Sequence, residues 1–131
     1  MPIARVTTFA IDGVTSRRVW VEADIRGGLP AFAIVGLADK AVREARERVR
    51  AAITNSGHEF PQKRITVNLA PAYLRKVGPG FDLPMAVAIL VASEQLDREA
   101  VADCAVVGEL SLSGEVRACL LYTSPSPRDR S

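Results

Sequence analysis

The stretch LRKVGPGFDLPMAVAIL, residues 74–90, constrains the fold more than any other part of the sequence. A basic pair leads into a Gly-Pro-Gly turn, an aspartate follows, and a long apolar segment predicts a helix from Leu83 to Gln95. We expect Asp82 to be the N-cap, because its carboxylate can accept free backbone N–H groups and oppose the positive helix end. Pro84 then lies in the first turn, where its missing N–H does no harm.

A glycine turn that opens a helix can bind phosphate, present a nucleophile or only redirect the chain. A P-loop needs G-x-x-x-x-G-K-[ST], but Lys76 precedes these glycines and Asp82 would repel phosphate. Nucleophilic catalysis needs an activated Ser, Cys or Lys, and Lys76 belongs to a basic pair that we expect to be solvated. The residues therefore favour a structural turn, with backbone freedom supplied by Gly78 and Gly80. Arg75 and Lys76 remain candidates for contact with nucleic acid or an acidic partner.

Strand and helix patterns alternate along the rest of the chain. ARVTTFAI and RRVWVEADI, separated by Asp12-Gly13, predict an opening hairpin. AFAIVG and RITVNLA predict two further strands on either side of a helical segment, and GELSLSGEVR resembles a short terminal hairpin. The order βββαβαββ indicates an α+β fold, a mixed sheet with two main helices packed against it.

The helical segment between these strands, residues 38–57, is amphipathic. Glu44–Arg48 and Arg43–Glu47 are spaced i,i+4, so a salt-bridged solvent face accounts for most of its charge. A nucleic-acid patch is the alternative, but aromatic residues that could stack on bases are missing there. The apolar residues at helical spacing are Val42, Ala45, Val49, Ala52 and Ile53.

The composition fits one ordinary globular domain. The chain has 131 residues, 48% hydrophobic and 24% charged, with a net charge of +2. Cys104, Cys119 and a single His58 exclude a disulfide framework and a Cys/His metal site, and they fit a reducing cytoplasm. We expect His58 on the surface. No signal peptide is visible, and the longest apolar run, MAVAILVA, is far shorter than the ~20 residues of a membrane span.

The end of the chain departs from the rest. From Cys119 the sequence reads CLLYTSPSPRDRS, and the periodicity is lost. Residues 119–129 resemble the in-frame translation of a sequencing-library adapter. We therefore expect residues 1–118 to be an incomplete domain, and residues 119–131 to be a non-native, disordered tail.

Several motifs, in order and at compatible spacing, resemble one known family. They are GLP…VGL, REARERVRAAI.NSG..FP, I.VNLAPA, G..FDLP.A.A.L and GEL.L.G, and they cover nearly all of residues 3–117. They are similar to the N-terminal domain of the magnesium-chelatase-like AAA+ ATPases of the ComM/YifB group. The resemblance implies a Lon-protease-like domain with the ribosomal-protein S5 domain 2 fold. It places Gly80 where Lon proteases carry the catalytic serine, so no Ser-Lys mechanism is expected at this turn.

The family's chemistry belongs to another module. The resemblance implies an AAA+ module after this domain that binds ATP and magnesium, a homo-oligomeric ring, and action on DNA such as branch migration during natural transformation. We expect no catalytic residue, cofactor or metal in the present residues, and no membrane. Two alternatives stay open: a stand-alone nucleic-acid- or protein-binding module, and a Lon-like peptidase with displaced residues, for which Ser111 and Ser113 are the candidates.

Overall fold

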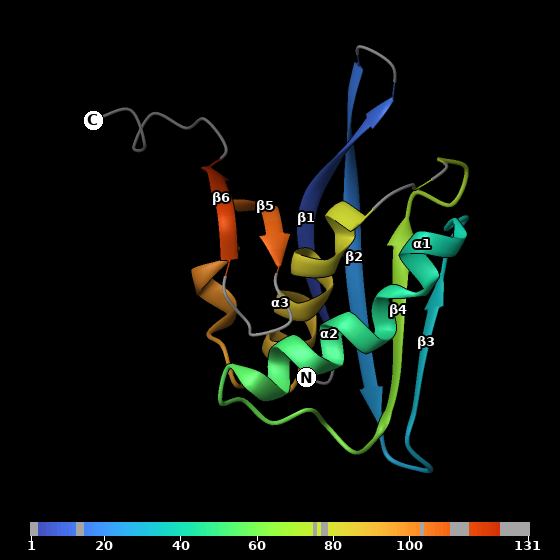
Figure 1. Cartoon of the computed structure of the whole chain (residues 1–131), viewed down its shortest axis with the longest axis vertical. Helices are drawn as coiled ribbons and strands as arrows, with labels where there is room; N and C mark the ends of the chain where they lie inside the picture. Colours follow the sequence, from blue (N-terminus) through green and yellow to red (C-terminus); the bar gives the residue numbers. More distant parts are fainter. Residues whose placement is uncertain are drawn as a thin grey trace.

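A six-stranded sheet forms the centre of the molecule (Figure 1). The computed structural model describes residues 3–12, 15–74, 76, 79–102, 104–110 and 116–123. The strands lie in the order β3-β4-β2-β1-β5-β6. Their bounds are Ile3–Asp12 for β1, Thr15–Arg26 for β2, Ala31–Val35 for β3, Arg64–Ala70 for β4, Cys104–Leu110 for β5 and Val116–Thr123 for β6.

The sheet is mixed. β1 pairs antiparallel with β2, β2 with β4, and β5 with β6, whereas β3 runs parallel to β4 and β1 parallel to β5. The helical elements are α1 (Lys40–Arg43), α2 (Ala45–Asn55) and α3 (Asp82–Ala92), with short 3-10 turns η1 (Pro79–Phe81) and η2 (Arg98–Ala100). The predicted α+β class, the mixed sheet and the two main helices are therefore confirmed.

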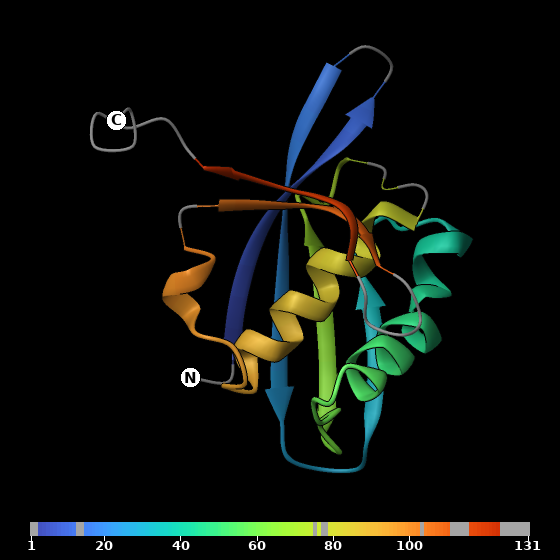
Figure 2. The same ribbon diagram turned by 60° about the vertical axis from the view of Figure 1, so that its left-hand side comes forward.

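Both main helices cover the same face of the sheet (Figure 2). The alternation of side chains along each strand explains this arrangement, because a strand presents every second residue to one face. On β4, Ile65, Val67 and Leu69 are buried under the helices, and the residues between them are only partly buried. β2 alternates in the same way, with Trp20, Glu22 and Asp24 on the open face.

The first helical segment follows the predicted pattern. Asp39 is a true N-cap, since its Oδ1 accepts a hydrogen bond of 2.8 Å from the backbone N–H of Val42. The segment divides at Glu44 into α1 and α2. Its buried residues are those expected from the periodicity: Val42, Ala45, Val49, Ala52 and Ile53.

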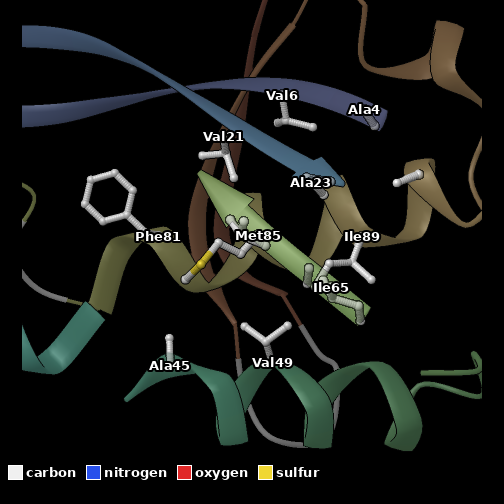
Figure 3. Packing of buried hydrophobic residues seen from close by; sticks show 14 of the residues in the cluster. Ala4, Val6, Val21, Ala23, Ala45, Val49, Ile65, Phe81, Met85 and Ile89 are labelled. Atoms are coloured by element: carbon white, nitrogen blue, oxygen red, sulfur yellow. The ribbon is translucent and has the colours of Figure 1, made fainter. Parts of the chain in front are cut away.

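Helix α3 is buried on most of its surface. Figure 3 shows Met85 and Ile89 between strand residues such as Val21 and the α2 residue Val49. A helix placed between a sheet and a second helix needs apolar side chains on several faces. This position explains why the sequence shows little amphipathic alternation there. The helix ends at Ala92 rather than at the expected Gln95, and Glu94 adopts a left-handed backbone conformation.

Strand β6 includes residues from the predicted tail. Residues 120–123 pair with β5, so a strand occupies part of the segment that we expected to be disordered. The run CLLYT is apolar and rich in residues that fit strands, which the loss of helical periodicity obscured. Residues 124–131 lie outside the described residues, and the adapter origin of the tail stays a prediction. Among the described helices, none combines the length and the apolar character needed to cross a membrane.

Candidate functional site

The glycine turn forms part of a corner at one end of the sheet. The carboxyl ends of the parallel strands β3 and β4 meet there, and α1 and α3 begin there (Figure 1). We define the corner as residues 36–39, 71–74, 76 and 79–82. Polar groups gather at such ends in many α/β proteins, which makes this corner the first place to look for a site.

Backbone contacts join the two strand ends closely. Gly36 has φ +99°, and a Cβ atom at this position would lie 2.3 Å from the carbonyl oxygen of Leu69. Only glycine permits this approach. Beyond it, the N–H of Lys76 donates to the carbonyl of Leu37 and the N–H of Asp39 donates to the carbonyl of Lys76, each at 3.0 Å. The corner is therefore a hydrogen-bonded unit rather than a loose loop.

Lys76 is buried, although we expected it to be solvated. Its side chain has no exposed surface, and its Nζ donates a hydrogen bond to the carbonyl oxygen of Pro71. Burial lowers the pKa of the Lys76 ammonium, because the charged form loses hydration. The assignment of Lys76 as a contact for nucleic acid or an acidic partner is therefore wrong in this conformation. Arg75, the other residue predicted to contact nucleic acid or an acidic partner, lies outside the described residues, as does Gly78.

Asp82 is buried too, but it is not the N-cap that we predicted. It is the first residue of α3, and Phe81 occupies the cap position without a side-chain bond. Asp82 is 3% exposed, and its carboxylate accepts hydrogen bonds from Arg48 Nε at 2.6 Å and Nη2 at 3.2 Å. These hydrogen bonds to Asp82 raise the pKa of the Arg48 guanidinium. A carboxylate this deeply buried requires a cation, and α2 supplies it.

The ion pairs on the first helical segment differ from the expected ones. Arg48 binds Asp82 across 34 residues of sequence instead of Glu44. Glu44 lies near Lys40, with 3.9 Å between Nζ and Oε2. Arg48 is the site residue that sequence reasoning missed. The signal that could have identified it was the acidic residue before a wholly apolar helix, because such a residue needs a partner when the helix is buried.

Gly80 lies in η1, and the corner turns there as expected. The reason that we gave for glycine is not supported, however. Its φ is outside the left-handed range, and a Cβ atom would have no other heavy atom within 4 Å. Position 80 could therefore carry a side chain such as serine without strain, yet it carries none. The alternative candidates Ser111 and Ser113 lie outside the described residues.

The described corner offers no assembled catalytic group. Lys76 has no surface that a substrate could reach, and Asp82 is neutralised by Arg48. His58 is exposed, as expected, and follows the far end of α2. Phosphate does not fit the corner, because the first turn of α3 carries the Asp82 carboxylate where a phosphate would need free N–H groups. Within the described residues, no cluster of His, Cys, Asp and Glu could bind a metal ion.

What the corner does expose is apolar. The side chain of Leu37 is 55% exposed and that of Tyr73 is 79% exposed, so both extend into solvent. Leu37 has φ +22°, an unusual backbone conformation for leucine. A fixed framework that presents apolar side chains is typical of a contact surface rather than of an active site.

Comparison with known proteins places the chain in a family. Residues 21–124 match the family described as subunit ChlI of Mg-chelatase, and the chain belongs to that family. Over 117 residues it is 51% identical to YifB of Salmonella typhimurium, 50% identical to YifB of Escherichia coli, and 47% identical to the competence protein ComM of Haemophilus influenzae. Each alignment covers 89% of this chain but 23% of the relative. The chain thus spans about a quarter of the length of these relatives.

Proposed function

We propose that this chain is a non-catalytic N-terminal domain of a longer magnesium-chelatase-like AAA+ ATPase of the ComM/YifB type. The identity of 47–51% with ComM and YifB over 117 residues carries the proposal. Those relatives are about four times as long, which leaves room for an ATPase module outside the present residues. The corner supports a non-catalytic role, because it lacks a serine at Gly80 and its charged groups are buried or paired.

In this proposal, ATP and magnesium bind to the module that follows, and that module drives a homo-oligomeric ring in the cytoplasm. The printed name of the Haemophilus relative, a competence protein, motivates a role on DNA during transformation. The present domain contributes a rigid contact unit. Its partners within the full-length protein are the ATPase module and, through the ring, further copies of the chain.

The first test concerns the gene. We would resequence the source DNA across the codon for Ala118 with a library made without transposase adapters. The expected result is an open reading frame that continues into G-x-x-x-x-G-K-[ST]. A frame that ends after Ser131 would contradict the proposal and favour a stand-alone binding module.

The second test concerns activity. The longer protein should hydrolyse ATP in a magnesium-dependent reaction, and mutation of its P-loop lysine should abolish this activity. The 131-residue chain is the matched control and should not hydrolyse ATP. Hydrolysis by the short chain alone, or none by the longer protein with or without DNA, would overturn the assignment. Salt-sensitive DNA binding by the short chain alone would also favour the stand-alone module.

A further inference from the structure

Strand β3 forms an edge of the sheet, with β4 as its one strand neighbour among the described residues (Figure 1). The run LPAFAIVGLA, residues 29–38, contains no charged residue. Leu29, Val35 and Leu37 are three of the five large apolar residues with the greatest exposure in the described chain. Edge strands usually carry charges that prevent pairing with another strand. This edge lacks them within the strand itself.

Arginine side chains flank β3 on both faces of the sheet. On the open face, Arg64 of β4 lies beside Ala31 on one side and directly opposite Arg26 of β2 on the other. Like charges at opposed positions are unfavourable. Arg26 is neutralised by Asp24 at 2.9 Å, but Arg64 has no carboxylate within 4 Å among the described residues.

On the face of the sheet that the helices cover, arginines without a carboxylate partner also lie near β3. Arg46 Nη1 lies 3.5 Å from the carbonyl oxygen of Phe32, and the Arg50 guanidinium stacks 4.9 Å from the Phe60 ring. Neither arginine has a carboxylate within 4 Å in the part of the chain that the structure describes. A hollow of about 350 Å³ opens beside the strand, lined by Phe32, Glu44, Arg46, Glu47 and Arg50. Two glutamates and two arginines line the hollow, so the cationic groups that could attract an acidic segment are the Arg46 and Arg50 guanidinium groups themselves.

We propose that the edge of β3 binds an extended acidic protein segment, which joins the sheet as an additional strand. Such a segment would present successive side chains to opposite faces, toward Arg64 on one side and toward Arg46 and Arg50 on the other. Apart from the Phe32 carbonyl, which Arg46 contacts at 3.5 Å, the outer edge of β3 offers its N–H and C=O groups to a further strand, and a peptide backbone matches their alternation. A nucleic acid would satisfy the arginines but not the backbone, which is why a peptide is favoured. The proposal does not depend on the ATPase assignment.

The test uses the whole chain and a fluorescein-labelled peptide built from repeats of Glu-Glu-Thr-Thr, which places carboxylates on both faces of a strand. Binding is measured by fluorescence anisotropy. We expect Arg46→Ala and Arg64→Ala each to weaken binding by about three- to ten-fold, since each removes one exposed charge partner. Both side chains lie on the surface, so the fold should persist. Arg18→Ala is the matched control, an exposed arginine on β2 away from β3, and it should not change the affinity.

Amide chemical shifts of the isotope-labelled chain distinguish strand addition from simple charge attraction. In the expected result, the peptide shifts the amides of residues 31–35 and protects them from hydrogen exchange. The proposal is overturned if no binding occurs, if a peptide with lysine in place of glutamate binds equally well, or if only the α2 amides respond. A short single-stranded oligothymidine that binds more tightly than the acidic peptide, with the same arginine dependence, would reassign the surface to nucleic acid.

Discussion

The ion pair between Arg48 and Asp82 should contribute strongly to stability, because it joins α2 to α3 in a largely buried setting. The variant Arg48→Met removes the cation and retains most of the apolar stem. Loss of one partner of a buried pair costs about 3–5 kcal/mol, because the remaining charge is left without compensation. Two features reduce that cost here. The Arg48 side chain is 36% exposed, and the positive end of α3 stabilises a carboxylate in its first turn by roughly 0.3–1 kcal/mol.

We therefore expect Arg48→Met to lower the free energy of unfolding by about 2–3 kcal/mol. In urea denaturation, with a slope of about 1.5 kcal/mol per M, this loss moves the midpoint down by roughly 1.3–2 M. Lys40→Ala is the matched control on the same segment. Its pair with Glu44 spans 3.9 Å between exposed side chains, so its effect should stay within about 0.5 kcal/mol.

A second substitution tests whether the uncompensated charge of Asp82 causes the loss of stability. In Arg48→Met combined with Asp82→Leu, no buried charge remains, and apolar replacement of a buried pair is often neutral. The double variant should therefore be more stable than Arg48→Met alone. The reasoning is refuted if Arg48→Met and Lys40→Ala lower the free energy of unfolding equally. It is also refuted if Asp82→Leu destabilises the Arg48→Met variant further.

Three further predictions concern the corner and the strand edge. Burial lowers the pKa of Lys76 below 10.5 in the native chain. As the pH approaches 10.5, the unfolded chain therefore binds more protons than the native chain, and the free energy of unfolding should increase with pH in this range. The variant Lys76→Met should not show this increase in the free energy of unfolding, measured by urea denaturation at a series of pH values. The same dependence of stability on pH in the variant and the original chain would contradict the prediction. Gly36→Ala should lower the thermal midpoint severely, because its Cβ would meet the Leu69 carbonyl, whereas Gly80→Ala should leave the midpoint unchanged or slightly raised. The exposed apolar run 29–38 should make the chain self-associate at high concentration. Val35→Lys should reduce this self-association, measured by light scattering, whereas Ile3→Lys, with almost the same exposure on β1, should not. Equal effects of the two variants would argue against β3 as the aggregation-prone edge.

Local patterns in the sequence predicted much of the fold. The apolar spacing between Val42 and Ile53 identified the buried face of the first helical segment, because helical periodicity and burial share one geometric cause. The alternation of Ile65, Val67 and Leu69 identified the buried face of β4 for the same reason. Such local patterns also gave the order in which strands and helices follow one another along the chain.

The candidate site was predicted less well. Asp82 satisfies the rule for an N-cap, but its carboxylate binds Arg48 from a distant segment, so a local rule gave the wrong partner. Lys76 stands beside a second basic residue in the sequence, which predicts solvent exposure. The structure buries it under the corner, where the Pro71 carbonyl accepts its hydrogen bond. Both errors arose where contacts between distant segments determine the environment.

The sequence by itself determined which faces of the helices and strands are apolar, the α+β class, the absence of a serine at Gly80, and the likeness to the ComM/YifB group. These properties depend on residue identity and spacing alone. Only the tertiary structure decided the pairing of Arg48 with Asp82, the burial of Lys76 and the need for glycine at position 36. It also decided the position of β3, an edge that no second described strand covers and that arginines flank. Each of these depends on the approach of segments that are remote in the chain. Burial and charge pairing follow from that approach, and no local pattern encodes it.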